Sequence, residues 1–475
     1  MENQITSKAS TAFISQRLSD TYASRHDLLE EAARRAARYL AKLDERPVFP
    51  TPDALAGLAA FEETLPEESQ DALQTLALLD NAGSPATVAS TGGRYFGFVF
   101  GGTLPATLAA NWLAGAWDQN AGLHVASPVA VKLEQVALTW LLDVLGLPAE
   151  AGGGFVTGAT MANFTALAAA RHAVLKQVGW DVEAQGLFGA PPITVIVGDE
   201  VHVSLLKALA MLGLGRERVV RVPVDGQGRM SPYALPRISG PTIVCIQAGN
   251  VNTGAFDPAG EIIQIAHKAG AWVHVDGAFG LWAAAVPDRA RLVAGVSEAD
   301  SWATDAHKWL NVPYDSGLVF CRQAAALRAA MANNPAAYLA EVGGQREPME
   351  YTPEMSRRAR GVEVWAALRS LGRSGLAEMV ERCCRHATRF AEGLKAVGYE
   401  VLNDVQLNQV LVSFGDLDKT LRVIKAVQQD GTCWCGSTVW QGRAAMRISV
   451  SSWATTDEDV EQSLDAVLRI AAGYR

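Results

Sequence analysis

The first part of the chain shows apolar residues at helical spacing. From Arg25 to Leu43 they recur about every 3.6 residues, and the pattern ends before the proline-containing stretch Pro47–Pro50. A second, short helix is predicted after Thr51. Because no strand accompanies these helices, we expect residues 1–90 to form a helical arm that packs on another domain or on another subunit.

Short apolar runs then alternate with helices and loops. Runs that are apolar on both faces and joined by crossovers are typical of a mainly parallel sheet covered on both sides. Residues 91–372 therefore predict a large α/β domain with a seven-stranded sheet, and function is expected at the carboxyl ends of its strands. The candidate strands are Gly154–Thr157, Ile193–Val197, Val219–Val222, Thr242–Ile246, Trp272–Asp276, Ser301–Thr304 and Gly317–Cys321.

The pattern changes after Gly372. A long helix is predicted first, and strands and further helices alternate after it. We expect residues 373–475 to form a smaller α+β domain. Its helices are predicted at 376–397, 417–428 and 456–471, and its strands near 408–414 and 444–450.

Composition and charge narrow the classes of partner. Hydrophobic residues make up 49% and charged residues 19% of the 475 residues, which is the balance of a compact globular protein. The formal net charge is −9 and no basic tract is present, so nucleic acids and anionic membrane surfaces are not expected as partners. No apolar segment reaches the roughly 20 residues that a membrane span requires.

The amino terminus and the cysteines bear on the compartment. The first residues lack the apolar core of a secretory signal. None of the six cysteines forms a Cys-x-x-Cys pair, so reduced thiols are favoured over a metal clip at Cys433 and Cys435. We therefore expect a cytoplasmic protein.

A glycine-rich segment is the first candidate for chemistry. Gly152–Asn163 predicts a strand that runs into a helix opening near Thr160. Free amides at the start of that helix, together with the Thr160 hydroxyl, would suit a phosphate. The motif is neither G-x-G-x-x-G nor a Walker loop, so a plain strand-to-helix turn remains an equal interpretation.

Polar residues stand at the ends of further predicted strands. Asp276 ends a buried strand, where a carboxylate needs a cationic partner. His274 lies on the same face of that strand, but no additional ligand cluster lies nearby, so a metal site is the less favoured alternative. Lys308 and His202 follow two other strands. A lysine in a partly dry pocket can form a Schiff base, whereas an isolated one is usually solvated.

In combination, these residues are the parts that pyridoxal 5'-phosphate (PLP) requires. A lysine holds the aldehyde as an imine, and a helix terminus holds the phosphate. A carboxylate keeps the pyridine nitrogen protonated, and an imidazole can stack on the ring. The sequence therefore predicts PLP as the cofactor.

The same motifs resemble those of the group II PLP-dependent decarboxylases, the aromatic-L-amino-acid and glutamate decarboxylase family. The resemblance extends from Arg94 to the carboxyl terminus. It implies the α/β fold-type I of PLP-dependent transferases and a homodimer with active sites at the subunit interface. It rests on His274–Ala278 (HVDGA), His307–Trp309 (HKW), Ser127-Pro128, Leu133-Glu134 and Trp140–Pro148.

The resemblance implies roles for residues around the cofactor ring. Lys308 would bind the aldehyde and Asp276 would face the pyridine nitrogen. His202 would stack on one face of the ring, and Ala278 would contact the other. Asn250 stands where the family often has a threonine near the ring hydroxyl.

Phosphate and substrate contacts follow from the same resemblance. The phosphate would be bound by Ala159 and Thr160, helped by groups around His307. The segment Arg94–Phe98 is similar to the family's substrate-side segment. The implied substrate contacts are Tyr95, Phe96, Phe98 and Arg447.

Two features depart from the family pattern. The family often has Asn-Pro or Asp-Pro before His-Lys, where this chain has Asp305-Ala306, and the backbone of this turn can therefore differ. Aromatic decarboxylases also use a tyrosine on a mobile loop to return a proton to Cα. The corresponding stretch is short here, and Tyr338 and Tyr351 are both candidates for that catalytic role.

The resemblance implies decarboxylation of an L-amino acid to an amine and CO2, and the aromatic residues at 95–98 favour an aromatic substrate. Another fold-type I reaction remains open, because aldolases, lyases, aminotransferases and oxidative deaminases share the ring chemistry. A non-enzymatic PLP-binding regulator is a further alternative, although neither an appended helix-turn-helix nor a basic patch is visible.

Overall fold

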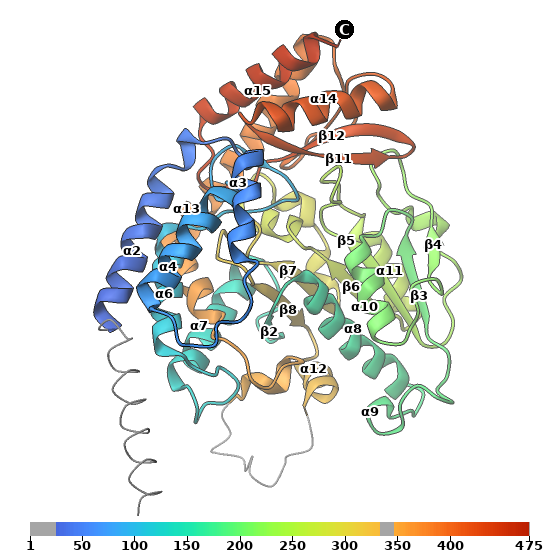
Figure 1. Cartoon of the computed structure of the whole chain (residues 1–475). Coiled ribbons are helices and arrows are strands. Elements are labelled where there is room, and N and C mark those ends of the chain that lie inside the picture. Colours follow the sequence, from blue (N-terminus) through green and yellow to red (C-terminus); the bar gives the residue numbers. More distant parts are fainter. Residues whose placement is uncertain (1–24, 333–345, 475) are drawn as a thin grey trace, which may run out of the picture.

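The computed structural model describes residues 25–332 and 346–474 (Figure 1). Its central sheet has the strand order β2-β8-β7-β6-β5-β3-β4. Only β8 runs antiparallel to its neighbours, so the predicted mainly parallel, seven-stranded sheet is confirmed. The strands are β2 (Gly152–Val156), β3 (Thr194–Gly198), β4 (Val220–Val222), β5 (Thr242–Gln247), β6 (Trp272–Asp276), β7 (Ser301–Asp305) and β8 (Gly317–Cys321).

Helices cover both faces of this sheet. Ile243 and Cys245 of β5 pack on one face with α8, α10 and α12. Val244 and Ile246 point the other way, into a larger core shared with α7, α11 and α13. Burial on both faces explains why the strands are apolar throughout. The helices are α7 (Pro128–Val144), α8 (Ala159–Lys176), α10 (Val203–Met211), α11 (Ala259–Lys268), α12 (Ala324–Met331) and α13 (Gly361–Ala396).

A buried ion pair joins α7 to the segment before α13. Glu134 of α7 has no exposed surface, and its two carboxylate oxygens accept hydrogen bonds from Arg357 at 2.6 and 2.7 Å. Arg357 also donates to the backbone oxygen of Phe155 in β2, at 3.1 Å. This one guanidinium therefore links α7 to the edge of the central sheet.

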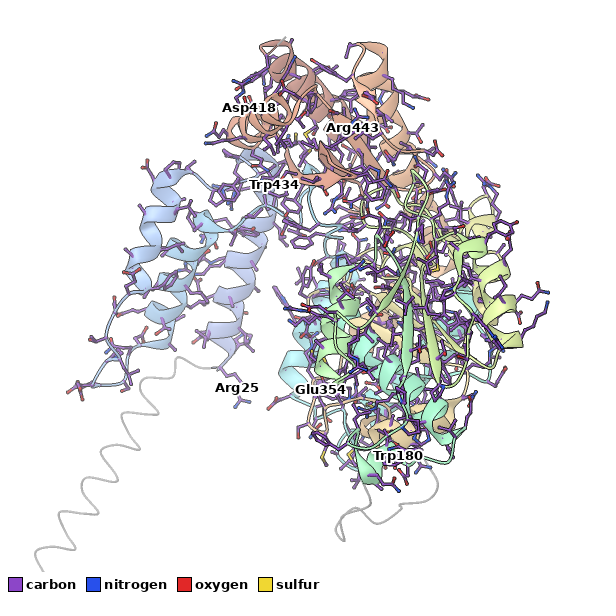
Figure 2. The ribbon with its side chains drawn as sticks, turned by 90° about the vertical axis from the view of Figure 1, so that its right-hand side faces the viewer. Arg25, Trp180, Glu354, Asp418, Trp434 and Arg443 are labelled. Carbon is purple, nitrogen blue, oxygen red and sulfur yellow. The ribbon has the colours of Figure 1, made fainter. Side chains whose placement is uncertain are left out.

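The amino-terminal helices lie beside the main body and are called the arm (Figure 2). The Asp80 carboxylate accepts from Arg35 and Arg38 of α2 at 2.8 and 2.7 Å, which links α2 to the segment after α4. No residue of α2 is buried within this chain. The arm helices are α2 (Arg25–Ala41), α3 (Pro52–Ala56), α4 (Ala72–Leu78) and α5 (Ser84–Ala86).

The carboxyl-terminal part contains a second sheet, in the order β1-β11-β12-β10-β9. The sequence predicted β10 and β12 but missed β1, β9 and β11. Tyr95 and Phe96 form β1, which pairs in parallel with β11 and so carries the 95–96 segment into this sheet. The remaining elements are β9 (Glu400–Val401), β10 (Gln409–Ser413), β11 (Trp434–Trp440), β12 (Arg443–Ser449), α14 (Leu417–Asp430) and α15 (Asp457–Ala472).

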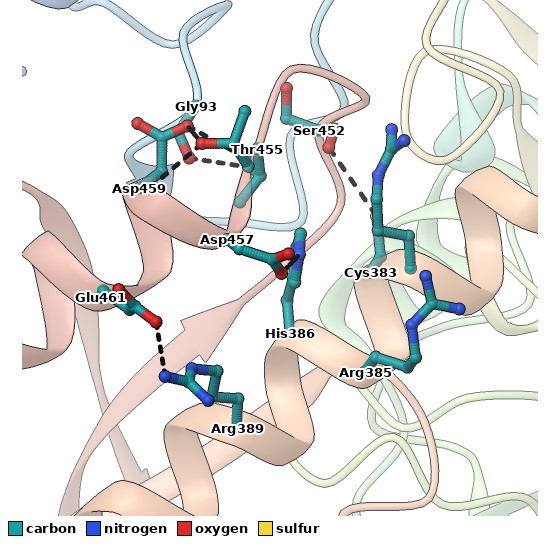
Figure 3. A network of polar contacts seen from close by, with 12 residues as sticks. Gly93, Cys383, Arg385, His386, Arg389, Ser452, Thr455, Asp457, Asp459 and Glu461 are labelled. Carbon is teal, nitrogen blue, oxygen red and sulfur yellow. Dashed lines mark hydrogen bonds and ion pairs between the residues drawn. The ribbon is translucent and has the colours of Figure 1, made fainter.

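The long helix α13 connects the two sheets. Its backbone leaves the helical region at Gly372, where φ is 61°, and its second part contains the predicted helix 376–397. Polar contacts fasten this second part to α15 and its preceding loop (Figure 3). They are His386 with Asp457 (3.0 Å), Arg389 with Glu461 (2.6 Å) and Cys383 with the backbone oxygen of Ser452 (3.8 Å).

Three further properties complete the architecture. Among the described helices, none has both the length and the apolar run that crossing a bilayer requires. All six cysteines are buried and free, as the prediction of reduced thiols requires. Within residues 25–332 and 346–474, no three His, Cys, Asp or Glu side chains gather in an arrangement that could hold a metal ion.

Candidate active site

The strand-end residues singled out in the sequence meet at the carboxyl edge of the central sheet. Asp276 ends β6, Lys308 follows β7, and His202 caps the amino terminus of α10 after β3. They lie close enough for their charges to act on one another. Burial lowers the pKa of His202 below its usual value, Asp276 opposes this shift, and Lys308 and Arg447 add to it.

A chain of buried hydrogen bonds orients Asp276. Its Oδ2 accepts from Asn163 Nδ2 at 3.1 Å, and its Oδ1 accepts from the backbone N–H of Ala278 at 3.2 Å. Asn163 Oδ1 in turn accepts from His274 Nε2 at 2.9 Å. Asn163 lies on α8, so His274 and Asp276 project from the same face of β6, as the two-residue period predicted.

His274 is therefore engaged at both ring nitrogens. Trp272 donates to Ser301 Oγ at 2.9 Å, and the Ser301 hydroxyl donates to His274 Nδ1 at 2.9 Å. Complete burial lowers the pKa of His274 to about 3, so the ring is neutral. A neutral ring with its proton on Nε2 fits every donor and acceptor in this chain of contacts.

The tautomer of His202 is also fixed by its neighbours. Its Nδ1 accepts from the backbone N–H of Ser204 at 3.3 Å and lies 2.7 Å from the Ser204 hydroxyl. An acceptor at Nδ1 places the proton of the neutral ring on Nε2. His202 can therefore present a flat, uncharged ring at the site, as stacking on a cofactor requires.

Four groups converge where β2 and β7 end. The Asp305 carboxylate accepts from the backbone N–H of Ala159 at 2.6 Å and lies 3.0 Å from Lys308 Nζ and 3.6 Å from His307 Nε2. His307 Nδ1 accepts from the backbone N–H of Ser316 at 3.1 Å, which leaves the ring proton on Nε2. Burial lowers the pKa of His307.

Glycines allow the backbones to approach closely here. A Cβ on Gly317 would lie 2.4 Å from the Cα of Gly158, which precedes α8. A Cβ on Gly101 would lie 1.7 Å from the backbone oxygen of Lys308. The helix start and the lysine turn are thus enclosed by main chain that only glycine permits. We call the region of Ala159, Thr160 and His307, where phosphate binding is predicted, the phosphate seat.

A shelf of aromatic rings leads from the small sheet toward Lys308. Tyr95 stacks on Trp434 with ring centroids 5.1 Å apart, and Phe98 lies 5.5 Å from the same indole. Phe100 contacts Tyr314 at 5.5 Å, and Tyr314 lies 4.4 Å from the His307 ring. We call Tyr95, Phe98, Phe100, Tyr314 and Trp434 the aromatic shelf.

The turn that carries the shelf is strained. Phe98 and Val99 have positive φ angles of 54° and 62°, a region that residues with a side chain rarely adopt. Gly97 is required because a Cβ there would lie 2.3 Å from the Trp434 ring. Such strain at a site edge holds Phe98 outward, with 54% of its surface exposed.

Phe96 differs from its neighbours on this segment. It projects from the opposite face of β1 into the hydrophobic core, where it is 1% exposed and packs edge-on against Phe390 at 5.1 Å. Its side chain therefore faces the hydrophobic core and not the site. Alternation along the two-residue strand separates it from Tyr95.

Arg447 of β12 brings a partly buried guanidinium to the site. Its Nη1 donates to Asn252 Oδ1 at 3.3 Å, and its Nε has no hydrogen-bond partner. Burial lowers the pKa of Arg447. Among the ion pairs of the described residues, none includes Arg447. It can therefore accept a carboxylate as a partner.

The side chain of Asn250 forms hydrogen bonds within its own loop. Its Oδ1 accepts from the backbone N–H groups of Asn252 and Thr253 at 2.9 and 3.2 Å. Its Nδ2 is buried and has no hydrogen-bond partner, and the position of a Cβ on Gly228 lies 3.2 Å from it. A contact between Asn250 and a ring hydroxyl remains a prediction.

The candidate proton donor Tyr351 does not lie near Lys308 in this chain. Tyr351 lies at the opposite end of β2, with a ring atom 3.8 Å from where a Cβ on Gly152 would be and with Arg346 stacked 4.4 Å above its ring. Tyr338 falls outside the described residues.

Sequence reasoning missed several residues that shape the site. Asn163 has no predicted role in the sequence, although an amide among the mostly apolar buried residues of a helix is a usable signal. Asn311 likewise has no predicted role. Its side chain donates to Ser451 O at 3.1 Å and accepts from Trp453 N at 2.9 Å, which ties the Lys308 turn to the small sheet.

These residues fit PLP. Asp276 is 4% exposed and has no cationic partner within the described residues, so its carboxylate lacks the counter-charge that a protonated pyridine nitrogen would supply. The phosphate seat offers the start of α8 and the Nε2 proton of His307. Lys308 lies 3.0 Å from Asp305 beside the phosphate seat, and its charge also acts on His202.

Comparisons with known proteins agree. A family model described as the pyridoxal-dependent decarboxylase conserved domain matches residues 60–415. The aromatic-L-amino-acid decarboxylase of Bacillus atrophaeus is 27% identical over 457 residues, which covers 90% of this chain and 92% of the relative. The L-2,4-diaminobutyrate decarboxylase of Rhizobium meliloti (strain 1021) is 29% identical over 382 residues, covering 76% and 74%.

The fold has close counterparts among solved structures. The crystal structure of Oryza sativa TDC with PLP and tryptamine superimposes with a TM-score of 0.86 at 22% identity, covering 94% of this chain and 97% of that one. Such a likeness supports the shared fold, and the family model adds the shared cofactor. The chain therefore belongs to the pyridoxal-dependent decarboxylase family and is a PLP-dependent amino acid decarboxylase.

Proposed function

We propose that this decarboxylase acts on an aromatic L-amino acid and releases the corresponding amine and CO2. The observation that carries the proposal is the aromatic shelf, which ends at His307, the residue next to Lys308. Aromatic rings favour offset and edge-on contacts with other rings, so the exposed faces of Phe98 and Tyr314 suit an aromatic side chain.

A bound PLP would supply an aldehyde that forms imines with amines and a ring that accepts electrons. Lys308 is the residue that would bind this aldehyde. Asp276, oriented by Asn163 and Ala278, holds a proton on the pyridine nitrogen. His202 would stack on one face of the cofactor ring and Ala278 would contact the other. The phosphate is held at the phosphate seat, and Asn250 remains a candidate near the ring hydroxyl.

The bond changes at the substrate are simple to balance. The bond between Cα and the carboxylate breaks, CO2 leaves without its electron pair, and a proton is added at Cα to give the amine. Arg447 orients the substrate carboxylate in this scheme, because its guanidinium has a buried and unpartnered Nε. The proton donor is the remaining assignment, with Tyr338 and Tyr351 as candidates.

A second candidate substrate is an acidic amino acid. The guanidinium of Arg447, with its buried and unpartnered Nε, favours it, since a side-chain carboxylate could satisfy that group as well as an α-carboxylate could. The relatives named above act, by their names, on aromatic amino acids and on 2,4-diaminobutyrate. The product screen described below decides among these substrate classes.

We also propose a homodimer located in the cytoplasm. The arm and its surroundings carry apolar residues on the surface of the single chain, including Leu29 (59% exposed), Leu79 (60%), Leu113 (56%) and Val125 (73%). Apolar surface of this kind is typical of an interface between subunits. A partner chain could also bring a loop tyrosine to the site, which the position of Tyr351 within one chain does not allow.

The test is a product screen on the PLP-loaded protein. We expect CO2 and amine from phenylalanine, tyrosine or tryptophan, with a higher kcat/KM than from glutamate or 2,4-diaminobutyrate. Lys308→Ala should abolish the visible absorbance of the bound cofactor and the CO2 release. Preference for glutamate would favour the second candidate, and retention of activity in Lys308→Ala would refute the assignment of Lys308.

The same screen separates decarboxylation from oxidative deamination. Tyr338→Phe and Tyr351→Phe are assayed for amine and for aldehyde. The variant that lacks the proton donor should lose amine formation, whereas the other should resemble the unmodified protein. Aldehyde as the main product of the unmodified protein would instead assign it to oxidative deamination.

A further inference from the structure

The Asp305 carboxylate occupies an unusual position for an acidic side chain. It is 2% exposed and gathers three positively polarised groups: the first N–H of α8 at Ala159 (2.6 Å), Lys308 Nζ (3.0 Å) and His307 Nε2 (3.6 Å). The Ala159 N–H and the His307 ring proton are also the groups that a phosphate at the start of α8 would use, whereas Lys308 is assigned to the cofactor aldehyde. A carboxylate and a phosphate therefore share two donors.

The backbone of Asp305 cannot move aside. Its N–H donates to Ala278 O at 3.0 Å, and its carbonyl accepts from Trp282 Nε1 at 3.2 Å. The next N–H groups, of Ala306 and His307, both donate to Ser316 O at 3.0 and 3.1 Å. Any adjustment to a bound phosphate must come from the Asp305 side chain alone.

We propose that Asp305 competes with the cofactor phosphate for the phosphate seat and thereby limits the affinity of this enzyme for PLP. Two anions held close together in a buried site repel each other strongly. The proposal rests on the placement of the phosphate at the start of α8, under the proposed function. Asp305 is then a positioning residue, which affects PLP binding through its contacts with Lys308 and the phosphate seat.

Removal of the carboxylate should affect two properties in opposite directions. Without PLP, Asp305→Asn loses the ion pair with Lys308 and should have a lower Tm. With PLP, the same variant no longer repels the phosphate, and the dissociation constant of PLP should fall by about tenfold or more. A purely structural aspartate would lower both Tm and affinity.

The measurement is a spectral titration of the cofactor-free full-length protein with PLP, combined with thermal unfolding before loading. Asp305→Ala accompanies Asp305→Asn, because alanine removes the charge without adding an amide that could itself bind phosphate. Tighter PLP binding in both variants is the expected result. Tighter binding in the asparagine variant alone, or in neither variant, would overturn the proposal.

Asp300 offers a matched control at the other end of β7. It is 8% exposed, accepts from the backbone N–H of Val273 at 2.7 Å and pairs with His267 at 2.9 Å. Asp300→Asn should therefore lower Tm and leave the PLP dissociation constant unchanged. A gain in PLP affinity in this variant would show that the effect is not specific to the phosphate seat.

Inorganic phosphate provides a readout independent of catalysis. A ligand that binds only the folded state raises Tm by mass action. Millimolar phosphate should raise the Tm of cofactor-free Asp305→Ala and leave that of the unmodified protein nearly constant. Tight phosphate binding by the unmodified protein would contradict competition by Asp305, and this measurement does not depend on the variant folding well.

Thr160→Val distinguishes failure of this proposal from failure of the phosphate placement. If Thr160→Val weakens PLP binding while the Asp305 variants do not strengthen it, the seat is correctly placed and the competition is refuted. If Thr160→Val also has no effect, the phosphate lies elsewhere and both statements fail. Decarboxylase activity enters neither outcome.

Discussion

Asn163 donates a hydrogen bond to Asp276 across 3.1 Å, from helix α8 to the end of strand β6. Its other amide atom accepts from His274, so Asn163 cannot rotate without breaking both contacts. The carboxylate that faces the pyridine nitrogen in the proposed function is thereby held by a helix that also begins at the phosphate seat.

Asn163→Ala should lower kcat more than it lowers stability. The variant leaves Asp276 without one of its two donors and His274 without its acceptor. A hydrogen bond to a charged group contributes about 1.5 to 3 kcal/mol, which corresponds to a loss of about ten- to hundredfold. Steady-state kinetics with saturating PLP, and the absorbance of the bound cofactor, measure the effect.

Asn403→Ala is the control for a buried amide in the small sheet. Asn403 bonds to the backbone of Thr253, Gln409 and Leu411 at 2.9 to 3.0 Å. Its loss should destabilise the fold and leave the cofactor spectrum unchanged. An equal effect of both variants on kcat would mean that Asn163 acts only through stability.

Part of this arrangement could be predicted from the sequence. The common face of His274 and Asp276 follows from the two-residue period of a strand, and both side chains contact Asn163. The positions of Lys308 and His202 follow from the rule that parallel strands present their carboxyl ends at one edge. Local periodicity was sufficient to predict these positions, because each residue lies on one predicted strand or shortly after it and depends on no contact between distant segments.

Other parts depend on contacts between distant segments. Trp434 joins the aromatic shelf only because β1 pairs with β11, and no local pattern in Tyr95-Phe96 indicates that pairing. The same pairing decides that Tyr95 stacks on Trp434 while Phe96 enters the core. The positive φ of Phe98 is likewise set by the surrounding packing. Substrate contacts were therefore harder to predict than cofactor contacts.

Protonation of His274 should destabilise the fold at low pH. Its pKa is about 3 in the folded protein, against an ordinary value of 6.5, because complete burial disfavours the charged ring. The unfolded chain therefore binds one more proton between those values. Stability should be complete above pH 6.5 and fall by about 1.4 kcal/mol per pH unit as the pH drops toward 3.

Urea unfolding at several pH values between 5 and 7 measures this slope. His274→Asn removes the titrating ring and should flatten the slope by the contribution of one proton, whatever its effect on stability at pH 7. The nitrogen chemical shifts of His274 should also remain those of a neutral ring down to pH 4.5. Titration of that signal near 6.5 would contradict the prediction.

The buried pair of Glu134 and Arg357 should be important for stability. Glu134→Ala leaves the Arg357 guanidinium, whose side chain is 1% exposed, without its carboxylate. Breaking one side of a buried pair typically costs about 3 to 5 kcal/mol, because the remaining charge stays out of water. Chemical denaturation of the cofactor-loaded protein gives the free energy of unfolding.

The pair of Glu378 and Arg382 is the exposed counterpart, with side chains 52% and 31% exposed. Glu378→Ala should cost less than about 1 kcal/mol, since water screens both charges. Equal stability of the two glutamate variants would mean that the buried pair of Glu134 and Arg357 stabilises the fold no more than the exposed pair does. The link between α7 and β2 would then depend on apolar packing alone.

Trp434→Ala should change substrate preference. The indole stacks on Tyr95 at 5.1 Å and on Phe98 at 5.5 Å, so its removal releases both rings of the aromatic shelf. Aromatic pairs contribute about 0.5 to 1.5 kcal/mol each beyond their buried area, so kcat/KM for an aromatic amino acid should fall by about tenfold. Trp434→Phe keeps a ring at this position and should recover most of the loss.

The decisive quantity is the ratio of kcat/KM values for an aromatic and a non-aromatic amino acid. If the aromatic shelf contacts the substrate ring, Trp434→Ala should lower this ratio. Only the aromatic substrate then loses a contact, because 2,4-diaminobutyrate has no ring. A shelf that only supports the turn at residues 97–101 would lower both values equally, because that turn lies against the backbone of Lys308 and its disorder would affect every substrate. An unchanged ratio would therefore assign the aromatic shelf to the fold and remove the main support for an aromatic substrate.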